Sequence, residues 1–324
     1  NINIAPSRGI VSEYDTTNSD YIKDSDIYSK DELFPVNIVS ITEDINLRGV
    51  ETIGLNISPV QYNPVRKELI VYTEIELSIE YEGGDSKFGD DRLRSMHWDP
   101  ILQHNILNYN SLLKINYSER FQQWISDDAE GAEYLIIIPD ESFREQAQRL
   151  ADYRSKQGII SKVFSLGDIN VNSHEKLRNW IIDAYNNWEI APVAICLLGD
   201  YDTNPSYGIS AFTFDFNGYA TYISDRPFAD IDNDLLPDIA ISRLSAANAN
   251  EAKIMVDKQI NYEFANPVTD EKFYKSPIMT CAFQMEKWFQ ISTESVNGYL
   301  SSIGKEPFRY TMHYYYGDDY NGEV

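Results

Sequence analysis

Basic residues, cysteines and long apolar runs are all scarce in this chain of 324 residues. It holds 27 Lys and Arg against 51 Asp and Glu, which gives a net charge of −24. Such a field repels phosphate backbones, so the composition argues against nucleic acid as a partner. No apolar run reaches 18 residues, so we expect no membrane-spanning helix. No signal peptide is visible in the first residues of the sequence.

The two cysteines, Cys196 and Cys281, are too few for a disulfide scaffold. Both lie in apolar runs that read as strands, so we expect two buried thiols. Neither a GxGxxG nor a GxxxxGK[ST] phosphate-binding motif occurs, and none of the four histidines is followed by glycine. The 43% of hydrophobic residues still allows an ordinary core, and the length is enough for two domains.

What stands out is a run of aspartates, Asp230, Asp232, Asp234 and Asp238, that leads into the apolar segment Ile239–Ile241. Carboxylates spaced by two on a turning loop can point inward together, and calcium prefers such hard oxygen ligands. An EF-hand is excluded, because Leu235 stands where its glycine belongs and Ile241 where its glutamate belongs. The sequence therefore predicts either a calcium site at these four residues or a solvated acidic turn.

The first part of the chain follows a period of two. From Leu69 to Tyr81, apolar and polar residues alternate, which predicts a long strand with one buried face. The turn signal Asn63–Lys67 pairs this strand with a candidate at Thr52–Val60, and Pro35–Thr42 supplies a third. Residues 1–84 therefore predict an all-β region, a small sandwich, followed by a linker from Gly83 to Arg94.

From Glu133 onward, short apolar runs alternate with amphipathic segments of helical period. The predicted strands are Tyr134–Ile138, Ile159–Phe164, Val193–Leu198, Pro237–Ile241, Pro277–Phe283 and Phe308–Tyr316. This alternation predicts an α/β domain with a mainly parallel sheet. We therefore divide the chain into residues 1–128 and 129–324. Because sites in such sheets lie beyond the carboxyl ends of the strands, we expect four loops at that edge: Pro139–Ser142, Gly199–Asn204, Ser224–Asp234, which carries three of the aspartates, and Gln284–Lys287.

Several segments, in order, resemble the gingipain family of cysteine peptidases. These are Tyr134–Pro139, Tyr153–Gly158, Leu197–Asp200, Ser224–Asp225, Ala229–Asp234, Pro237–Arg243 and Ile260–Glu263. Three earlier segments resemble the family's β-sandwich prodomain: Leu47–Val50, Pro59–Pro64 and Leu69–Glu76. The resemblance implies a caspase-like α/β fold, incomplete here, and a secreted or cell-surface cysteine endopeptidase made as a zymogen. Its substrates would be peptides or proteins, with a cell-surface or secretion-system partner as a further expectation.

The family's Gly-His-Gly and Ala-Cys segments are absent from this chain, so no residue is assigned as catalytic or cofactor-binding, and the Cys/His dyad is expected beyond residue 324. A rival dyad, Cys281 with His313, is disfavoured because no glycine turn exposes the cysteine and no base lowers its pKa. Two alternatives stay open: a sortase-like transpeptidase of type IX secretion, and a non-catalytic surface or assembly subunit. The resemblance also implies a basic side chain that blocks the cleft, with candidates Arg92, Arg94, Lys114 and Arg120, each of which also reads as an ordinary surface charge.

Overall fold

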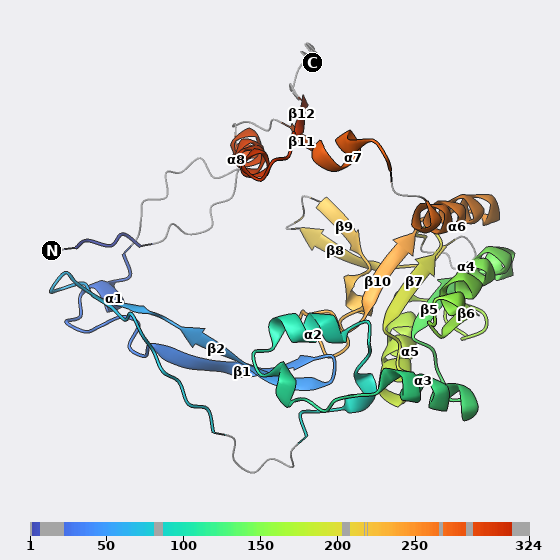
Figure 1. The fold of residues 1–324 in the computed structure, drawn as a ribbon, viewed down its shortest axis with the longest axis horizontal. Helices are drawn as coiled ribbons and strands as arrows, with labels where there is room; N and C mark the ends of the chain where they lie inside the picture. Colours follow the sequence, from blue (N-terminus) through green and yellow to red (C-terminus); the bar gives the residue numbers. More distant parts are fainter. Residues whose placement is uncertain are drawn as a thin grey trace. The chain divides into compact units, whose positions relative to one another are not determined.

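The computed structural model describes residues 2–6, 23–80, 87–202, 208–216, 218, 220–265, 268–282 and 288–312 (Figure 1). The chain divides into two compact units, Asn1–Val256 and Asp257–Val324. The fold class predicted from the sequence is confirmed: an antiparallel β region comes first, and an α/β domain with a parallel sheet follows it. No helix in the described ranges is long and apolar enough to cross a membrane.

The described residues of the N-terminal region form two antiparallel hairpins and three α-helices. The elements are α1 (Ser25–Tyr28), β1 (Val39–Leu47), β2 (Val50–Ile57), β3 (Val60–Asn63), β4 (Glu68–Val71), α2 (Asp99–Asn105) and α3 (Tyr117–Ser126). The β3–β4 hairpin turns where the sequence predicted, at residues 64–67. The predicted partner is wrong, because most of Thr52–Val60 belongs to β2, which pairs with β1. The long strand predicted from Leu69 is wrong in length, because β4 ends at Val71 and residues 72–80 form no strand.

The turn between β1 and β2 consists of Arg48 and Gly49, whose φ angles are 48° and 76°. Two left-handed residues in succession favour a two-residue hairpin, and glycine adopts this conformation without strain. A Cβ on Gly49 would stand 2.6 Å from Leu93. The predicted linker is therefore docked from Phe88 onward, where Glu51 donates its N–H to the Phe88 carbonyl and Asp90 donates to that of Gly49.

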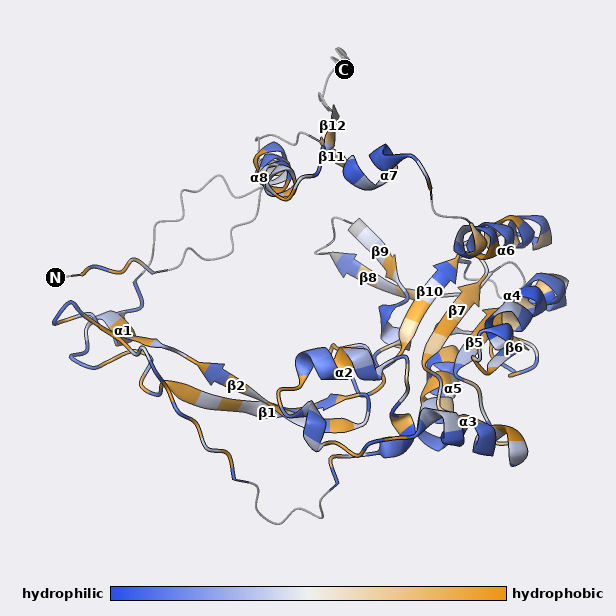
Figure 2. Ribbon diagram, viewed as in Figure 1, coloured by the Kyte–Doolittle hydropathy of each residue, from blue (hydrophilic) through white to orange (hydrophobic). Residues whose placement is uncertain are grey.

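The first unit is built around a four-stranded parallel sheet in the order β10-β7-β5-β6 (Figure 1). Its strands are β5 (Tyr134–Ile138), β6 (Ser161–Ser165), β7 (Ala194–Leu198) and β10 (Ala240–Leu244). In β5 and β7 every residue after the first is buried, as expected of strands covered on both faces. Figure 2 shows β7 as an apolar strand. The predicted apolar runs thus coincide with the centre of the sheet.

Helices cover both faces of this sheet. They are α4 (Arg144–Lys156), α5 (His174–Asn187) and α6 (Ala249–Phe264), which begins in the first unit and continues into the second. Leu177 and Ile181 of α5 share one core cluster with alternate residues of β5 and β7. The remaining residues of β5 face the other side, where α4 packs on β5 and β6. Gly158, at φ 82°, ends α4 as predicted.

Between β7 and β10 lies an antiparallel hairpin that the sequence analysis missed, β8 (Phe212–Phe216) with β9 (Ala220–Ser224). The second unit contains α7 (Glu271–Lys275), β11 (Ile278–Ala282), α8 (Trp288–Ser302) and β12 (Phe308–Met312). Its two strands pair in parallel, as the alternation of strand and helix predicts. The order of elements from β5 to β12 therefore follows the predicted order, with this hairpin and α7 added.

Replacing Glu133 by glutamine should raise the free energy of unfolding at neutral pH. Glu133 is 5% exposed just before β5, and its carboxylate accepts the Ile160 N–H at 3.2 Å. Burial raises its pKa, so this group's contribution to stability is complete below the unfolded pKa and is lost as the pH rises through the folded value. Glutamine keeps the acceptor without the charge. Urea unfolding at pH 4 and pH 8 should show a gain only at the higher pH; equal effects at both would contradict this.

Candidate metal centre

The aspartate run forms a loop between a turn of 3-10 helix at Arg226–Phe228 and strand β10. Two of its residues, Asn233 and Leu235, have left-handed φ angles of 66° and 75°. Asp232 accepts the Asp234 N–H at 3.2 Å, and Asp234 accepts the Leu236 N–H at 2.7 Å. The spacing by two therefore serves first to close successive turns with side-chain acceptors.

Three of the four predicted ligands come together. Asp230, Asp232 and Asp238 each offer a carboxylate oxygen, and these oxygens lie within 4.8 Å of one another. Asp230 and Asp238 are buried, at 6% and 4% exposure, while Asp232 is exposed. Asp234 is not one of the three. The loop thus places two buried carboxylates and one that water can reach around a single point.

The electrostatics of this cluster favour a cation. Burial, reinforced by Asp232, Asp234 and Asp230, raises the pKa of Asp238 to about 6, against the effect of the Ile231 N–H that its carboxylate accepts at 2.9 Å. Burial also raises the pKa of Asp232, with Asp234 and Asp230 adding to the shift. A bound cation would relieve both penalties, because it stabilises the charged form of every carboxylate around it.

The surroundings of Asp230 indicate whether these residues fit a metal ion. Its Oδ1 is buried without a hydrogen-bond partner among the described residues. Its Oδ2 lies 3.5 Å from Nη2 of Arg226, which offsets part of the charge. An orphaned buried acceptor costs about 1–3 kcal/mol. Hard carboxylate oxygens suit calcium, which takes about 6–8 oxygen ligands, so carbonyls and water would have to complete the shell. The donor set fits calcium.

Arg178 on α5 fixes the shape of the loop. Its Nε donates to the Pro227 carbonyl at 2.7 Å, and its Nη2 donates to the Asp230 carbonyl at 2.6 Å and to Oδ1 of Asn233 at 3.0 Å. A guanidinium held by a packed helix can anchor several acceptors at once. Nothing in the local sequence pattern of α5 marks this residue, so it was not predicted as part of the site.

The predicted loop begins at the carboxyl edge, where Asp225 pairs with Arg243, but it ends at the opposite edge of the sheet. Asp238 stands two residues before β10, and Arg48 donates both to its carbonyl and to that of Pro192, two residues before β7. Asp238 is therefore at the amino end of a parallel strand, away from the carboxyl edge where such sheets carry their catalytic loops. A cation here would hold the loop and would not take part in chemistry at that edge.

At the carboxyl ends of β7 and β10 the structure shows a different constellation. Arg243, at 11% side-chain exposure, forms a bidentate pair with Asp225 and donates to the carbonyls of Gly199 and Asp200. These contacts tie the segment after β9 to the segment after β7. The loop Gln284–Lys287, also expected at this edge, lies outside the described residues.

The cysteines differ from each other. Cys196 is buried in β7, and burial raises the pKa of its thiol to about 11, so it is not a nucleophile at neutral pH. Cys281 in β11 is half-buried, which corrects the expectation of two buried thiols. His313, its proposed partner in the rival dyad, lies outside the described residues.

Three of the four candidate plug residues have other roles. Arg92 donates to the carbonyls of Tyr185, Asn186 and Trp188, where it caps the C-terminus of α5. Arg94 is buried against Asp99, and Arg120 donates to the carbonyls of Asp91 and Arg94. Lys114 is exposed. The first three are thus structural cations in the N-terminal region.

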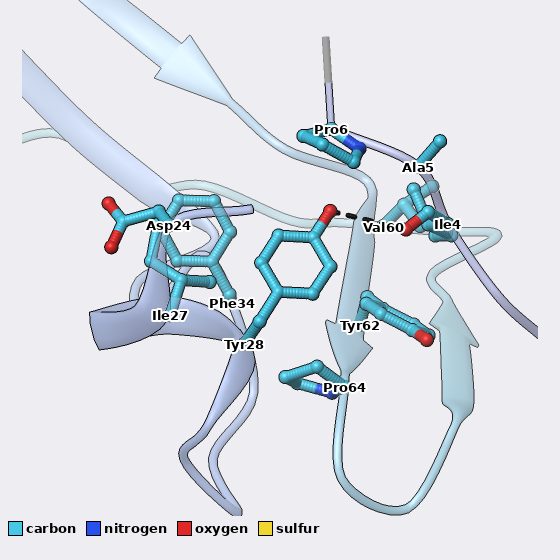
Figure 3. A pocket seen from close by; sticks show the side chains of 10 residues that line it. All are labelled: Ile4, Ala5, Pro6, Asp24, Ile27, Tyr28, Phe34, Val60, Tyr62 and Pro64. Atoms are coloured by element: carbon cyan, nitrogen blue, oxygen red, sulfur yellow. Dashed lines mark hydrogen bonds between the residues drawn. The ribbon is translucent and has the colours of Figure 1, made fainter. Parts of the chain in front are cut away.

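The N-terminal region also holds a cavity of about 490 Å³ (Figure 3). It is lined by Ile4, Ala5, Pro6, Asp24, Ile27, Tyr28, Phe34, Val60, Tyr62 and Pro64. Tyr28 stands in its centre and donates its hydroxyl to the Ile4 carbonyl at 3.2 Å. The cavity shares no residue with the acidic loop, and its lining is mostly apolar.

Comparison with known families gives two successive matches. The propeptide of family C25 matches residues 1–116, and Peptidase family C25 matches residues 127–323. The two matches follow each other as the predicted β region and α/β domain do.

The relatives include gingipain R2 of Porphyromonas gingivalis, 23% identical over 83% of this chain and 34% of its own length. Lys-gingipain W83 of the same species is 22% identical over 85% of this chain and 14% of its own. The chain thus spans about a third or less of these relatives. Among solved structures, the Arg-specific cysteine proteinase gingipain R aligns with a TM-score of 0.45 and 16% identity, over 58% of this chain and 42% of that one.

Proposed function

This chain belongs to peptidase family C25, and we propose that it forms the propeptide and the first part of the catalytic domain of a gingipain-type cysteine endopeptidase. The observation that supports this best is the succession of a propeptide match and a peptidase match along one chain. We also propose that the chain consists of two domains, a propeptide domain at residues 1–128 and a catalytic subdomain at residues 129–324. The substrates would be peptides or proteins.

The proposed reaction is hydrolysis of a peptide bond by a Cys/His dyad. The thiolate attacks the carbonyl carbon, the histidine protonates the leaving amine, and water then releases the acyl group from the sulfur. Neither Cys196, buried with a raised pKa, nor Cys281, within a strand, suits this role. We therefore place the dyad outside residues 1–324, in line with the greater length of the gingipains.

The zymogen proposal is supported by the way the propeptide region contacts the α/β domain. Arg92 caps α5, and the buried Arg48 donates to carbonyls at the amino ends of β7 and β10. Such contacts would hold the propeptide region on the α/β domain until it is cleaved. We further propose export from the cell, to the medium or the cell surface, as for a secreted peptidase.

We also propose that Asp230, Asp232 and Asp238 bind calcium, with Asp234 shaping the turn. The buried orphan oxygen of Asp230 and the raised pKa of Asp238 support this. The ion would supply positive charge that holds the loop before β10.

A cysteine-directed probe tests the enzyme proposal. The full-length gene product should react with an iodoacetamide probe at a cysteine outside residues 1–324, and substitution of that cysteine should abolish both labelling and peptide hydrolysis. As a matched control, the double variant Cys196→Ser, Cys281→Ser should keep both. Labelling confined to Cys281, or no labelling and no hydrolysis in any form, would replace the peptidase by a non-catalytic subunit.

A further inference from the structure

The most deeply buried cation of the described chain is in an unexpected place, the turn of a hairpin. Arg48 is 1% exposed although it occupies the β1–β2 turn, a position that normally faces water. It belongs to the segment matched by the propeptide family. Burying an arginine costs several kcal/mol unless its charge is compensated.

The contacts of Arg48 reach across to the α/β domain. Nη1 donates to the Pro192 carbonyl at 3.0 Å and to the Asp238 carbonyl at 2.8 Å. The guanidinium carbon lies 5.3 Å from the ring centre of Trp98 and 5.5 Å from that of Tyr185. Within the described ranges it forms no salt bridge. Carbonyl oxygens and aromatic faces contact the guanidinium, and the negative charges of Asp238 and Glu133 favour its charged form from farther away.

Asp238 is also the residue that closes the acidic loop. Its N–H donates to the Ala229 carbonyl at 2.8 Å, and its carboxylate accepts the Ile231 N–H at 2.9 Å. The remaining polar group of Asp238, its backbone carbonyl, accepts the hydrogen bond from Arg48. The backbone that carries one of the three clustered carboxylates is thus fixed from the propeptide side.

We propose that Arg48 is a positioning residue for the acidic loop, so that docking of the β1–β2 turn sets the loop's affinity for a cation. This rests on the proposed calcium site. Because coupling between two binding events is reciprocal, calcium in the loop would in turn strengthen the docking of the propeptide region. Loss of calcium would then loosen the propeptide at Arg48.

Charge alone makes the opposite prediction. A guanidinium near the cluster repels a bound cation, so removing it would tighten calcium binding if Coulomb repulsion dominated. Positioning dominates in our proposal because Nη1 contacts the Asp238 carbonyl directly and fixes a buried ligand. The sign of the change in affinity therefore separates the two effects.

The test uses calcium titration calorimetry on the full chain. Arg48→Met keeps an unbranched apolar stem but loses the guanidinium and both hydrogen bonds, and it should weaken calcium binding at least about tenfold, the loss expected for a hydrogen bond to a charged group. Arg48→Lys keeps a donor and should recover part of the affinity. Arg92→Met is the matched control, because it also breaks contacts between the propeptide region and α5 but touches no part of the loop.

Unchanged or tighter calcium binding by Arg48→Met, or equal weakening by Arg92→Met, would overturn the proposal. If the unsubstituted chain binds no calcium, the calcium assignment itself fails, and amide exchange decides the positioning role. The amides of Ile231 and Asp238 should then exchange faster in Arg48→Met than in Arg92→Met. Equal exchange in the two variants would remove the positioning role as well.

Discussion

Replacing Arg94 by methionine is expected to lower the free energy of unfolding by about 3–5 kcal/mol, the usual cost of breaking a buried ion pair on one side. Arg94 donates from Nε and Nη2 to the two oxygens of Asp99, both at 2.7 Å, and its side chain is only 3% exposed. Tyr109 and Tyr117 donate their hydroxyls to the same carboxylate at 3.0 and 2.6 Å. The variant leaves a buried carboxylate without its cation.

The pKa of Asp99 describes the same balance. Burial alone would raise it, but Arg94 and the two tyrosine hydroxyls hold it below its ordinary value. Without Arg94 the carboxyl group would take up a proton more readily, so the loss of stability should be larger at pH 7 than at pH 4.

Urea unfolding of the full chain measures this effect, and two variants control it. Arg66→Met breaks an ion pair with Asp31 in which both side chains are more than half exposed, so its midpoint should not move measurably. Asp99→Asn added to Arg94→Met removes the orphaned charge and should recover part of the loss. If Arg94→Met and Arg66→Met shift the midpoint equally, the buried network does not contribute as proposed.

The centre of the α/β domain could be predicted because its signals are local. The strand Tyr134–Ile138 was predicted with its observed bounds, since a run of buried apolar residues between polar ends has few other interpretations. The helical spacing of Leu177, Ile181 and Ala184 likewise marked the buried face of α5. In both cases the same residues determine local structure and packing.

The local sequence pattern gave wrong strand bounds where the length of a strand depends on the strand that pairs with it. The alternation from Leu69 continues to Tyr81, yet Leu77 and Ile79 are 40% and 44% exposed, and β4 ends at Val71. Alternation marks two faces but does not provide the strand that must pair with them. The missed β8–β9 hairpin had a usable signal in the dipeptide Asn217-Gly218, a pair of residues that favours turns.

For the candidate metal site, the sequence predicted which carboxylates gather but not where they lie in the fold. The spacing of Asp230, Asp232 and Asp238 indicated that carboxylates would gather, because a tight loop brings such neighbours together. Their place at the amino end of β10 and the arginines that fix them were not predictable, since Arg48 and Arg178 come from distant parts of the chain. Long-range contacts of single side chains leave no periodic trace in a sequence.

Removal of calcium is expected to lower the thermal midpoint of the full chain. A ligand that binds only the native state stabilises it by about 2.7 kcal/mol when present at a hundred times its dissociation constant. The effect should be large here because the apo loop keeps an unpaired buried oxygen on Asp230 and a carboxyl on Asp238 whose pKa is raised to about 6. Differential scanning calorimetry with added calcium and with a chelator measures the shift.

Two neighbouring aspartates provide the matched comparison. Asp232→Asn removes a carboxylate from the group of three and should abolish most of the calcium-dependent shift, while Asp234→Asn should keep it, since Asp234 lies outside the group and its oxygen can still accept the Leu236 N–H as an amide. A chelator that leaves every midpoint unchanged would make the loop a solvated acidic turn. A shift that Asp234→Asn abolishes and Asp232→Asn preserves would place the ion elsewhere on the loop. Only the expected pattern joins the ion to the three carboxylates that the fold brings together.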